Sequence, residues 1–152
     1  MKKSKTYSKT IKTPIVSNEP IALYFPATFI KSKVLENLSK SSKDIFNEVV
    51  LKTGLTLKIL AENIFEITPK TLIKYKNNET KIPSRITEIA IEINILFDLG
   101  NVIFGSPEVF NLWLNKENSF FNNLKPSFFL NTSTGIHLVY EELKRIEFGA
   151  TA

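Results

Sequence analysis

Cysteine is absent from this chain of 152 residues, and glycine occurs only five times. Without cysteine there is no disulfide framework and no thiolate metal site, which fits a protein kept in a reducing cytoplasm. So few glycines leave little material for a phosphate-cradling loop, and the glycine-rich nucleotide-binding motifs are missing. No apolar run approaches the roughly 20 residues that span a bilayer, and no signal segment follows the first lysines. We expect a cytoplasmic protein with no membrane segment.

Side chains that together run a reaction are also missing. His137 is the only histidine, and a lone histidine without cysteines or a carboxylate pair is usually a surface or packing residue. Glu141 and Glu142 are neighbours on a predicted helix, so their side chains point roughly 100° apart. We therefore expect no catalytic residue, no metal site and no cofactor, and we predict that the protein is not an enzyme.

Positive charge gathers at the front of the chain, within a net charge of +5. Residues 1–20 contain five lysines and one glutamate, and residues 21–90 contain eleven basic and seven acidic side chains. Residues 91–152 reverse this balance, with four basic and seven acidic side chains. A polyanion such as DNA is therefore expected at the front.

Residues 1–27 are predicted to form a basic flexible arm. They are rich in Lys, Ser and Thr and are broken by Pro14, Pro20 and Pro26, which favours an extended or disordered chain. The apolar run 21–25 is a place where the arm orders locally. Two interpretations stay open: a solvated tail, or an arm that contacts the phosphate backbone of DNA.

Residues 28–82 are predicted to form a helical module with a helix-turn-helix. A short helix at about 29–38 precedes a second one that Gly54 ends. Thr56 then caps a third helix, and Thr68 caps a fourth that has Pro69 in its first turn. Two short helices with a tight join, the second exposing cations, are what a helix-turn-helix needs. The predicted DNA contacts are Lys70, Thr71, Lys74 and Lys76.

The join between these two helices departs from the usual helix-turn-helix pattern. Counted from Ala61 it is one residue longer, and Phe65 stands where a small residue is expected. The alternative is an ordinary helical pair whose lysines are simply solvated.

Residues 83–152 are predicted to form a connector helix followed by a second helical unit. The connector begins near Ser84 and carries Ile86, Ile89, Ile93, Leu96 and Phe97 on one face. A helix this apolar is expected to bury surface against both modules and against a second copy, which predicts a homodimer. The alternative is the core helix of one compact domain.

The stretch from Phe104 onward carries a specific pattern. It opens F-G-x-P-E-x-F-x-x-W-L-N and closes L-x-T-x-x-G-x-x-L-V-x-x-E-L-x-R-I-E-x-G. This pattern resembles the toxin-binding domain of Xre/MbcA/ParS-type antitoxins, and the segment 67–75 is similar to the recognition helix that precedes that domain. The chain departs from the family in the loop 118–123, which contains no glycine, and at Thr151, where a large residue is usual.

The resemblance implies an all-α antitoxin that binds a cognate toxin, usually a RES-domain enzyme that consumes NAD, and represses its own operon at operator DNA. The apolar tail is expected to plug the toxin's active site. The predicted toxin contacts are Trp113, Arg145, Glu147, Phe148, Gly149, Ala150, Thr151 and Ala152. Two alternatives remain: a stand-alone helix-turn-helix regulator whose C-terminal domain only dimerises, and an interaction module that has lost DNA binding.

Overall fold

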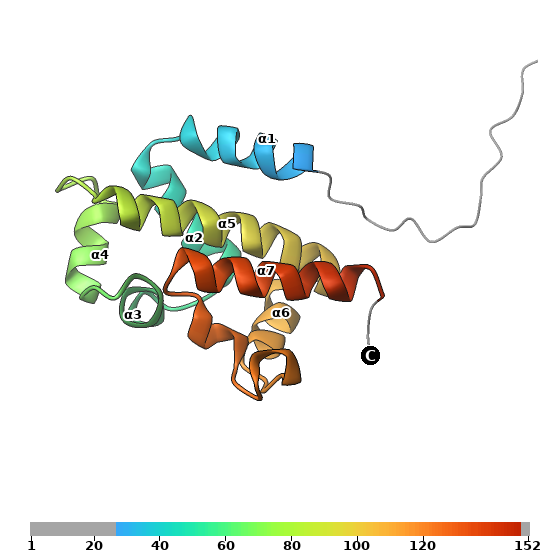
Figure 1. Cartoon of the computed structure of the whole chain (residues 1–152). Helices are drawn as coiled ribbons and strands as arrows, with labels where there is room; N and C mark the ends of the chain where they lie inside the picture. Colours follow the sequence, from blue (N-terminus) through green and yellow to red (C-terminus); the bar gives the residue numbers. More distant parts are fainter. Residues whose placement is uncertain (1–26, 150–152) are drawn as a thin grey trace, which may run out of the picture.

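The structure, a computed structural model, describes residues 27–149 and forms an all-α fold, as predicted. The helices are α1 (Ala27–Leu38), α2 (Ser42–Thr53), α3 (Leu57–Ile59) with its π-helical continuation (Leu60–Phe65), α4 (Pro69–Lys76), α5 (Ser84–Phe104), α6 (Pro107–Leu114) and α7 (Ser133–Glu147). Two short 3-10 turns, Ser119–Phe121 and Pro126–Phe129, join α6 to α7 (Figure 1). The predicted arm lies outside the described residues, except for Ala27 at the start of α1.

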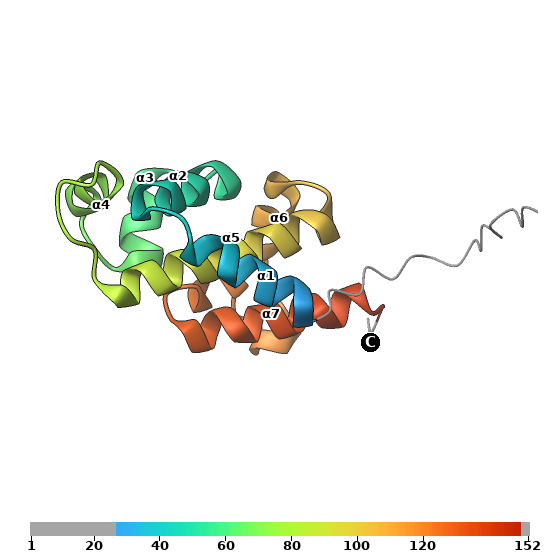
Figure 2. The same cartoon turned by 90° about the horizontal axis from the view of Figure 1, so that it is seen from above.

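Helix α5 runs through the middle of the molecule, as Figures 1 and 2 both show. It packs on α1 and α2, which precede it in the sequence, and on α6 and α7, which follow it. Its apolar residues belong to one cluster that runs from Ile45 on α2 to Leu143 on α7. The boundaries at residues 27 and 82 stay predictions. The buried residues of α5 are Ile86, Ile89, Ala90, Ile91, Ile93, Asn94, Ile95, Leu96, Phe97, Leu99 and Gly100.

The isoleucine-rich face that was expected to hold a homodimer is occupied by the chain itself. Ile93 and Phe97 are both 0% exposed, and Ile86 is 4% exposed. These three side chains are packed inside the chain and are not available to a second copy; elsewhere on α5, Ile91, Ile95 and Leu96 line two grooves. The sequence interpretation was therefore wrong about this face, because apolar content alone does not tell which partner buries a helix.

The helix caps at Thr56 and Thr68 lie where the sequence analysis placed them, and Ser106 caps α6 in the same way. Each of the three accepts a hydrogen bond from the backbone N–H three residues later. Gly54 and Gly105 end α2 and α5 in the left-handed conformation, with φ of 62° and 82°. Such caps satisfy N–H groups that a helix end otherwise leaves unpaired. These local signals explain why the helix boundaries were predictable.

The longer join between α3 and α4 has a structural cause. The backbone widens to a π-helix over Leu60–Phe65, and the N–H groups of Glu66 and Ile67 both donate to the carbonyl oxygen of Ala61. A π turn accommodates one extra residue in a helix. Phe65, unexpectedly large for this position, is completely buried against Phe46 of α2, with ring centroids 5.3 Å apart.

Gly100 lets α6 approach α5 closely. A Cβ atom at this position would overlap the ring of Phe110, which is itself 0% exposed. Phe110 also contacts Phe97 with ring centroids 4.9 Å apart. Two amides reinforce the packing on α2: the buried Asn94 donates to the Ile45 carbonyl at 3.2 Å, and the half-buried Asn111 donates to the Thr53 carbonyl at 2.6 Å.

Within residues 27–149, no single helix has both the length and the apolar composition to cross a membrane. Helices α5 and α6 meet those criteria only as a pair, and the pair is bent by 103°.

We predict that Gly100→Ala destabilises the fold by about 1–3 kcal/mol, because the new methyl group must displace the Phe110 ring. This sign is opposite to the usual effect, since Gly→Ala inside a helix ordinarily adds roughly 1 kcal/mol of stability. Urea denaturation followed by circular dichroism measures the change. Val102→Ala, at a position of α5 that is 45% exposed, is the matched control and should change little. A Gly100→Ala variant as stable as the control would contradict the close approach.

Candidate functional site

A chain of aromatic rings fixes the C-terminal part of the molecule to α5. Phe110 stacks on Trp113 with centroids 5.9 Å apart, and Trp113 contacts Phe121 at 6.4 Å. Phe121 in turn contacts Phe129 at 5.2 Å, and Phe104 lies 5.4 Å from Trp113. Trp113, a predicted toxin contact, is thus a half-buried member of this cluster. Its direct visible role is to hold α6 and the two 3-10 turns together.

Arg145, another predicted toxin contact, forms a two-pronged ion pair within α7. Its Nε lies 2.7 Å from Oε2 of Glu142, and its second nitrogen lies 2.9 Å from Oε1. Glu142 is 1% exposed and also accepts a hydrogen bond from Asn118 at 3.4 Å. The guanidinium lies 5.9 Å from the centre of the Phe120 ring. The Arg145–Glu142 pair therefore connects α7 to the first 3-10 turn.

At the end of α7, the carboxylate of Glu147 is buried and the ring of Phe148 is exposed. Both carboxylate oxygens of Glu147 are buried and have no hydrogen-bond partner, and this burial raises the pKa of the group above its ordinary value. Phe148 is 56% exposed, and Gly149 follows with φ 69°, a left-handed conformation that suits glycine. Ala150, Thr151 and Ala152 lie outside the described residues. Of the predicted tail contacts, Phe148 is the one presented as an apolar surface side chain.

Further apolar side chains are exposed on α6, in the segment after it, on α7 and at its end, and the sequence interpretation singled out only Phe148 among them. Leu112 on α6 is 72% exposed, and Phe128 in the second 3-10 turn is 64% exposed. On α6, Val109 lies three residues before Leu112, so the two side chains share one face of the helix. This spacing could have been recognised in the sequence. Exposed apolar groups that gather on one part of a chain often mark a surface for a partner protein. The set comprises Val109, Leu112, Phe120, Leu124, Phe128, Leu138 and Phe148.

The outer face of α4 carries most of the predicted DNA contacts. Lys70 and Lys74 are exposed, Lys76 is half-buried, and none of the three forms an ion pair with another residue of the range 27–149. Thr71 is half-buried, and its hydroxyl lies 2.8 Å from the Thr68 hydroxyl, so its side chain is engaged in the helix cap. The face also includes Ile73, which is 43% exposed. The outer surface of α4 therefore presents the ammonium groups of Lys70 and Lys74 beside the apolar side chain of Ile73.

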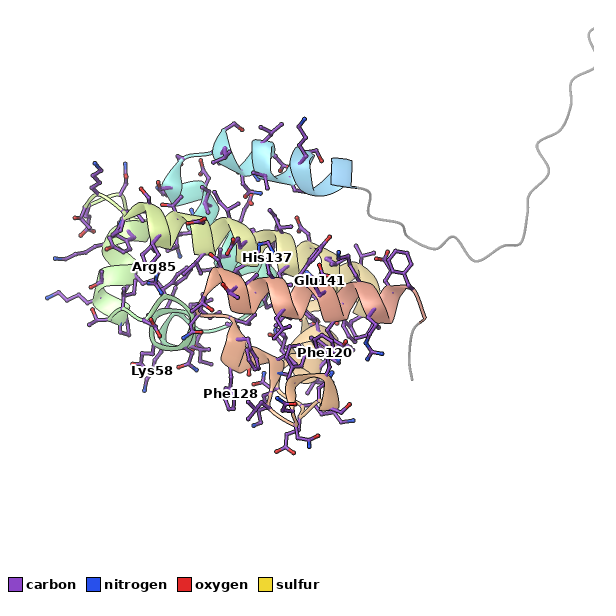
Figure 3. All side chains as sticks on the ribbon, in the orientation of Figure 1. Lys58, Arg85, Phe120, Phe128, His137 and Glu141 are labelled. Carbon is purple, nitrogen blue, oxygen red and sulfur yellow. The ribbon has the colours of Figure 1, made fainter. Side chains whose placement is uncertain are left out.

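The join before α4 is attached to the C-terminal part by a polar cluster that was not predicted. Glu66 adopts the left-handed conformation, with φ 54°. Its carboxylate accepts a hydrogen bond from the Asn131 amide at 2.9 Å and pairs with Arg85 at 3.5 Å. Arg85 also donates to the Asn131 carbonyl at 3.3 Å. Residues from the join, from the start of α5 and from the approach to α7 meet here, near the Arg85 label in Figure 3.

We predict that Arg145→Ala destabilises the fold by about 2 kcal/mol, because it leaves the buried Glu142 carboxylate without its cation. This value is below the usual cost of breaking a buried pair, because the Arg145 side chain is 37% exposed and screened by water. Chemical denaturation measures the loss.

Lys144→Ala is the matched control for this prediction. Lys144 pairs with Glu141, whose side chain is 62% exposed, so its removal should change stability by less than about 0.5 kcal/mol. The double variant Glu142→Gln/Arg145→Ala should recover part of the lost stability, since it removes the buried charge. Equal effects of Arg145→Ala and Lys144→Ala would show that the ion pair does not support the fold.

Comparison with known proteins agrees with this arrangement. Residues 99–149 match the family model of the antitoxin Xre/MbcA/ParS C-terminal toxin-binding domain. The match begins at the end of α5 and includes α6, both 3-10 turns and α7. A search among curated proteins found no match. The resemblance stated from the sequence is confirmed for residues 99–149, which match the C-terminal toxin-binding domain of Xre/MbcA/ParS-type antitoxins.

Proposed function

We propose that the protein neutralises a RES-type, NAD-consuming toxin by direct binding in the cytoplasm, and represses its own operon through DNA binding. The match of residues 99–149 to a toxin-binding domain is the observation that carries this proposal. The exposed apolar side chains of the same segment supply a contact surface of the kind that protein partners use. DNA binding is supported by the capped helix pair α3–α4 and by the cations on α4.

Toxin binding would be anchored by the end of α7. Phe148 extends from a helix fixed by Val139 and Leu143, which are both 0% exposed, so its direction is set by the core. Gly149 permits a close approach of the backbone to the partner. Large aromatic side chains dominate the energy of many interfaces, because they bury much area with little loss of conformational freedom. The tail beyond Gly149 would continue into the toxin's active-site entrance.

Deleting residues 148–152 should abolish or strongly weaken protection from the toxin, while DNA binding stays intact. Co-expression with the cognate toxin in growing cells measures protection, and a pull-down of the toxin by the purified chain measures binding. Phe148→Ala alone should lower affinity by about 2 kcal/mol or more if the ring is the anchor. Full protection by the truncated chain would rule out the plug mechanism. Loss of both protection and DNA binding would instead show that residues 148–152 are needed for the chain to fold.

DNA binding would place the outer face of α4 in the major groove. Lys70 and Lys74 would contact phosphates, and Thr71 would stabilise the start of the helix through its cap. Each neutralised phosphate makes affinity fall with salt concentration. A helix-turn-helix protein generally binds paired half-sites as a dimer. Because the isoleucine-rich face of α5 is buried inside the chain, the proposed homodimer must use another surface.

Reversing three charges, Lys70→Glu, Lys74→Glu and Lys76→Glu, should lower operator affinity by orders of magnitude at low salt. The fold should persist, because none of these side chains belongs to the apolar core. A mobility shift on the upstream region of the operon measures the effect. The matched control reverses three exposed lysines away from α4, at Lys31, Lys43 and Lys116, and so changes the net charge equally. If both triple variants lose affinity to the same extent, α4 is not the reading helix.

A further inference from the structure

Two apolar grooves flank helix α1 where it lies on α5. The first, here called the α5–α7 groove, has a volume of about 390 Å³ and a floor of Val34, Ile95, Leu96, Ile136 and Tyr140. The second adjoins the first along α5, has a volume of about 530 Å³ and shares Val34, Glu92 and Ile95 with it. Helix α1 thus covers only part of the apolar surface that α5 and α7 offer.

The α5–α7 groove contains an acidic group that lacks a donor. Oε2 of Glu92 is buried and has no hydrogen-bond partner, and Oε1 lies 3.8 Å from Nε2 of His137. A second carboxylate, that of Glu141, stands at the rim. Figure 3 shows His137 and Glu141 on the side of α7 that faces α5. A buried oxygen without a partner is costly, so the matching occupant brings an N–H group or an ammonium together with apolar side chains.

The chain itself contains a segment with this chemistry. Residues 21–25 read Ile-Ala-Leu-Tyr-Phe, and residues 1–20 before them contain five lysines. The apolar run suits the floor, and the lysines are complementary to Glu92 and Glu141. A nucleic acid does not suit this groove, because its phosphates would face the carboxylates.

The segment is also within reach. It ends one residue before α1, and Val34, which lines both grooves, is on the second turn of that helix. The distance from Ala27 to Val34 is about 10 Å at 1.5 Å per residue. Five extended residues cover about 17 Å at 3.3–3.4 Å per residue. A chain that reverses direction at Pro26, a residue that favours turns, is therefore long enough to reach Val34, which lines the groove.

We propose that residues 21–25 dock in the α5–α7 groove of their own chain, with apolar side chains over Ile95, Ile136 and Tyr140 and a donor to Glu92. This interaction does not depend on the proposed function. It has a consequence for partners, because it covers one face of α7, which belongs to the toxin-binding domain. A protein that binds α7 through His137 or Glu141 must displace the arm.

The absence of native cysteine permits a direct test by disulfide formation in the full chain. The test pair is Leu23→Cys with His137→Cys, since His137 has a side chain that is 74% exposed and tolerates replacement. The control pair is Leu23→Cys with Val102→Cys. Val102 is 45% exposed and lines neither groove. It lies one turn after Asp98, whose carboxylate is 3.7 Å from the Lys33 ammonium of α1. Both positions are close to α1, so the tether alone favours neither.

We expect the test pair to form an intrachain disulfide at least about tenfold faster than the control pair, because docking raises the local concentration of residue 23 at the groove. Adding Tyr24→Ser and Phe25→Ser to the test pair should slow it to the control rate. Non-reducing electrophoresis and mass spectrometry distinguish the products. Equal rates for the two pairs, or no effect of the serine substitutions, would overturn the proposal. Mainly interchain disulfides would also overturn it and would assign the groove to a second copy.

Discussion

Burial of α5 is the constraint on which the other elements depend. Helices from both ends of the chain pack on it, so their relative positions follow from the shape of one helix surface. Gly100 admits the Phe110 ring at one end, and Asn94 ties α5 to the α2 backbone near its middle. The α3–α4 pair packs on α2, with Phe46 between Phe65 and Tyr75. The proposed DNA surface and the toxin-binding domain are therefore held by one continuous core.

The surface contacts between the join before α4 and the approach to α7 are weak compared with the shared core. Their side chains are largely exposed, 54% for Arg85 and 52% for Glu66. Contacts of this kind contribute at most about 1 kcal/mol. They orient the join, whose left-handed Glu66 is their common member, but they do not determine stability. The packed side chains of α5 connect α7 to α2, and α4 packs on α2 in turn.

Local signals in the sequence predicted the elements well, and long-range packing explains what they missed. Caps such as Thr68 and the stop at Gly105 act within one helical turn, so they can be recognised without knowing the fold. The pattern that opens at Phe104 likewise identified the C-terminal domain, because rare residues recur there at fixed spacing. The burial of the Ile86–Phe97 face inside the chain depends on helices far apart in the sequence. The pairing of Arg145 with Glu142 could be predicted from their spacing of three residues on α7. The burial of Glu142 could not, because it depends on packing against other parts of the chain. The π turn at Leu60–Phe65 had one signal, the extra residue in the join.

The conformation at the end of α7 decides between two ways in which the tail can bind. Electrostatic mimicry of a nucleotide would need a carboxylate that faces the partner, yet both oxygens of Glu147 are buried. Their burial raises the pKa of this group above its ordinary value. Phe148, in contrast, is 56% exposed next to a glycine that allows close approach. An apolar anchor at Phe148 requires no rearrangement of α7, whereas a charged contact through Glu147 first requires that side chain to turn outward. For the proposed toxin contact, the exposure of Phe148 and the burial of Glu147 therefore favour an apolar anchor over a charged one.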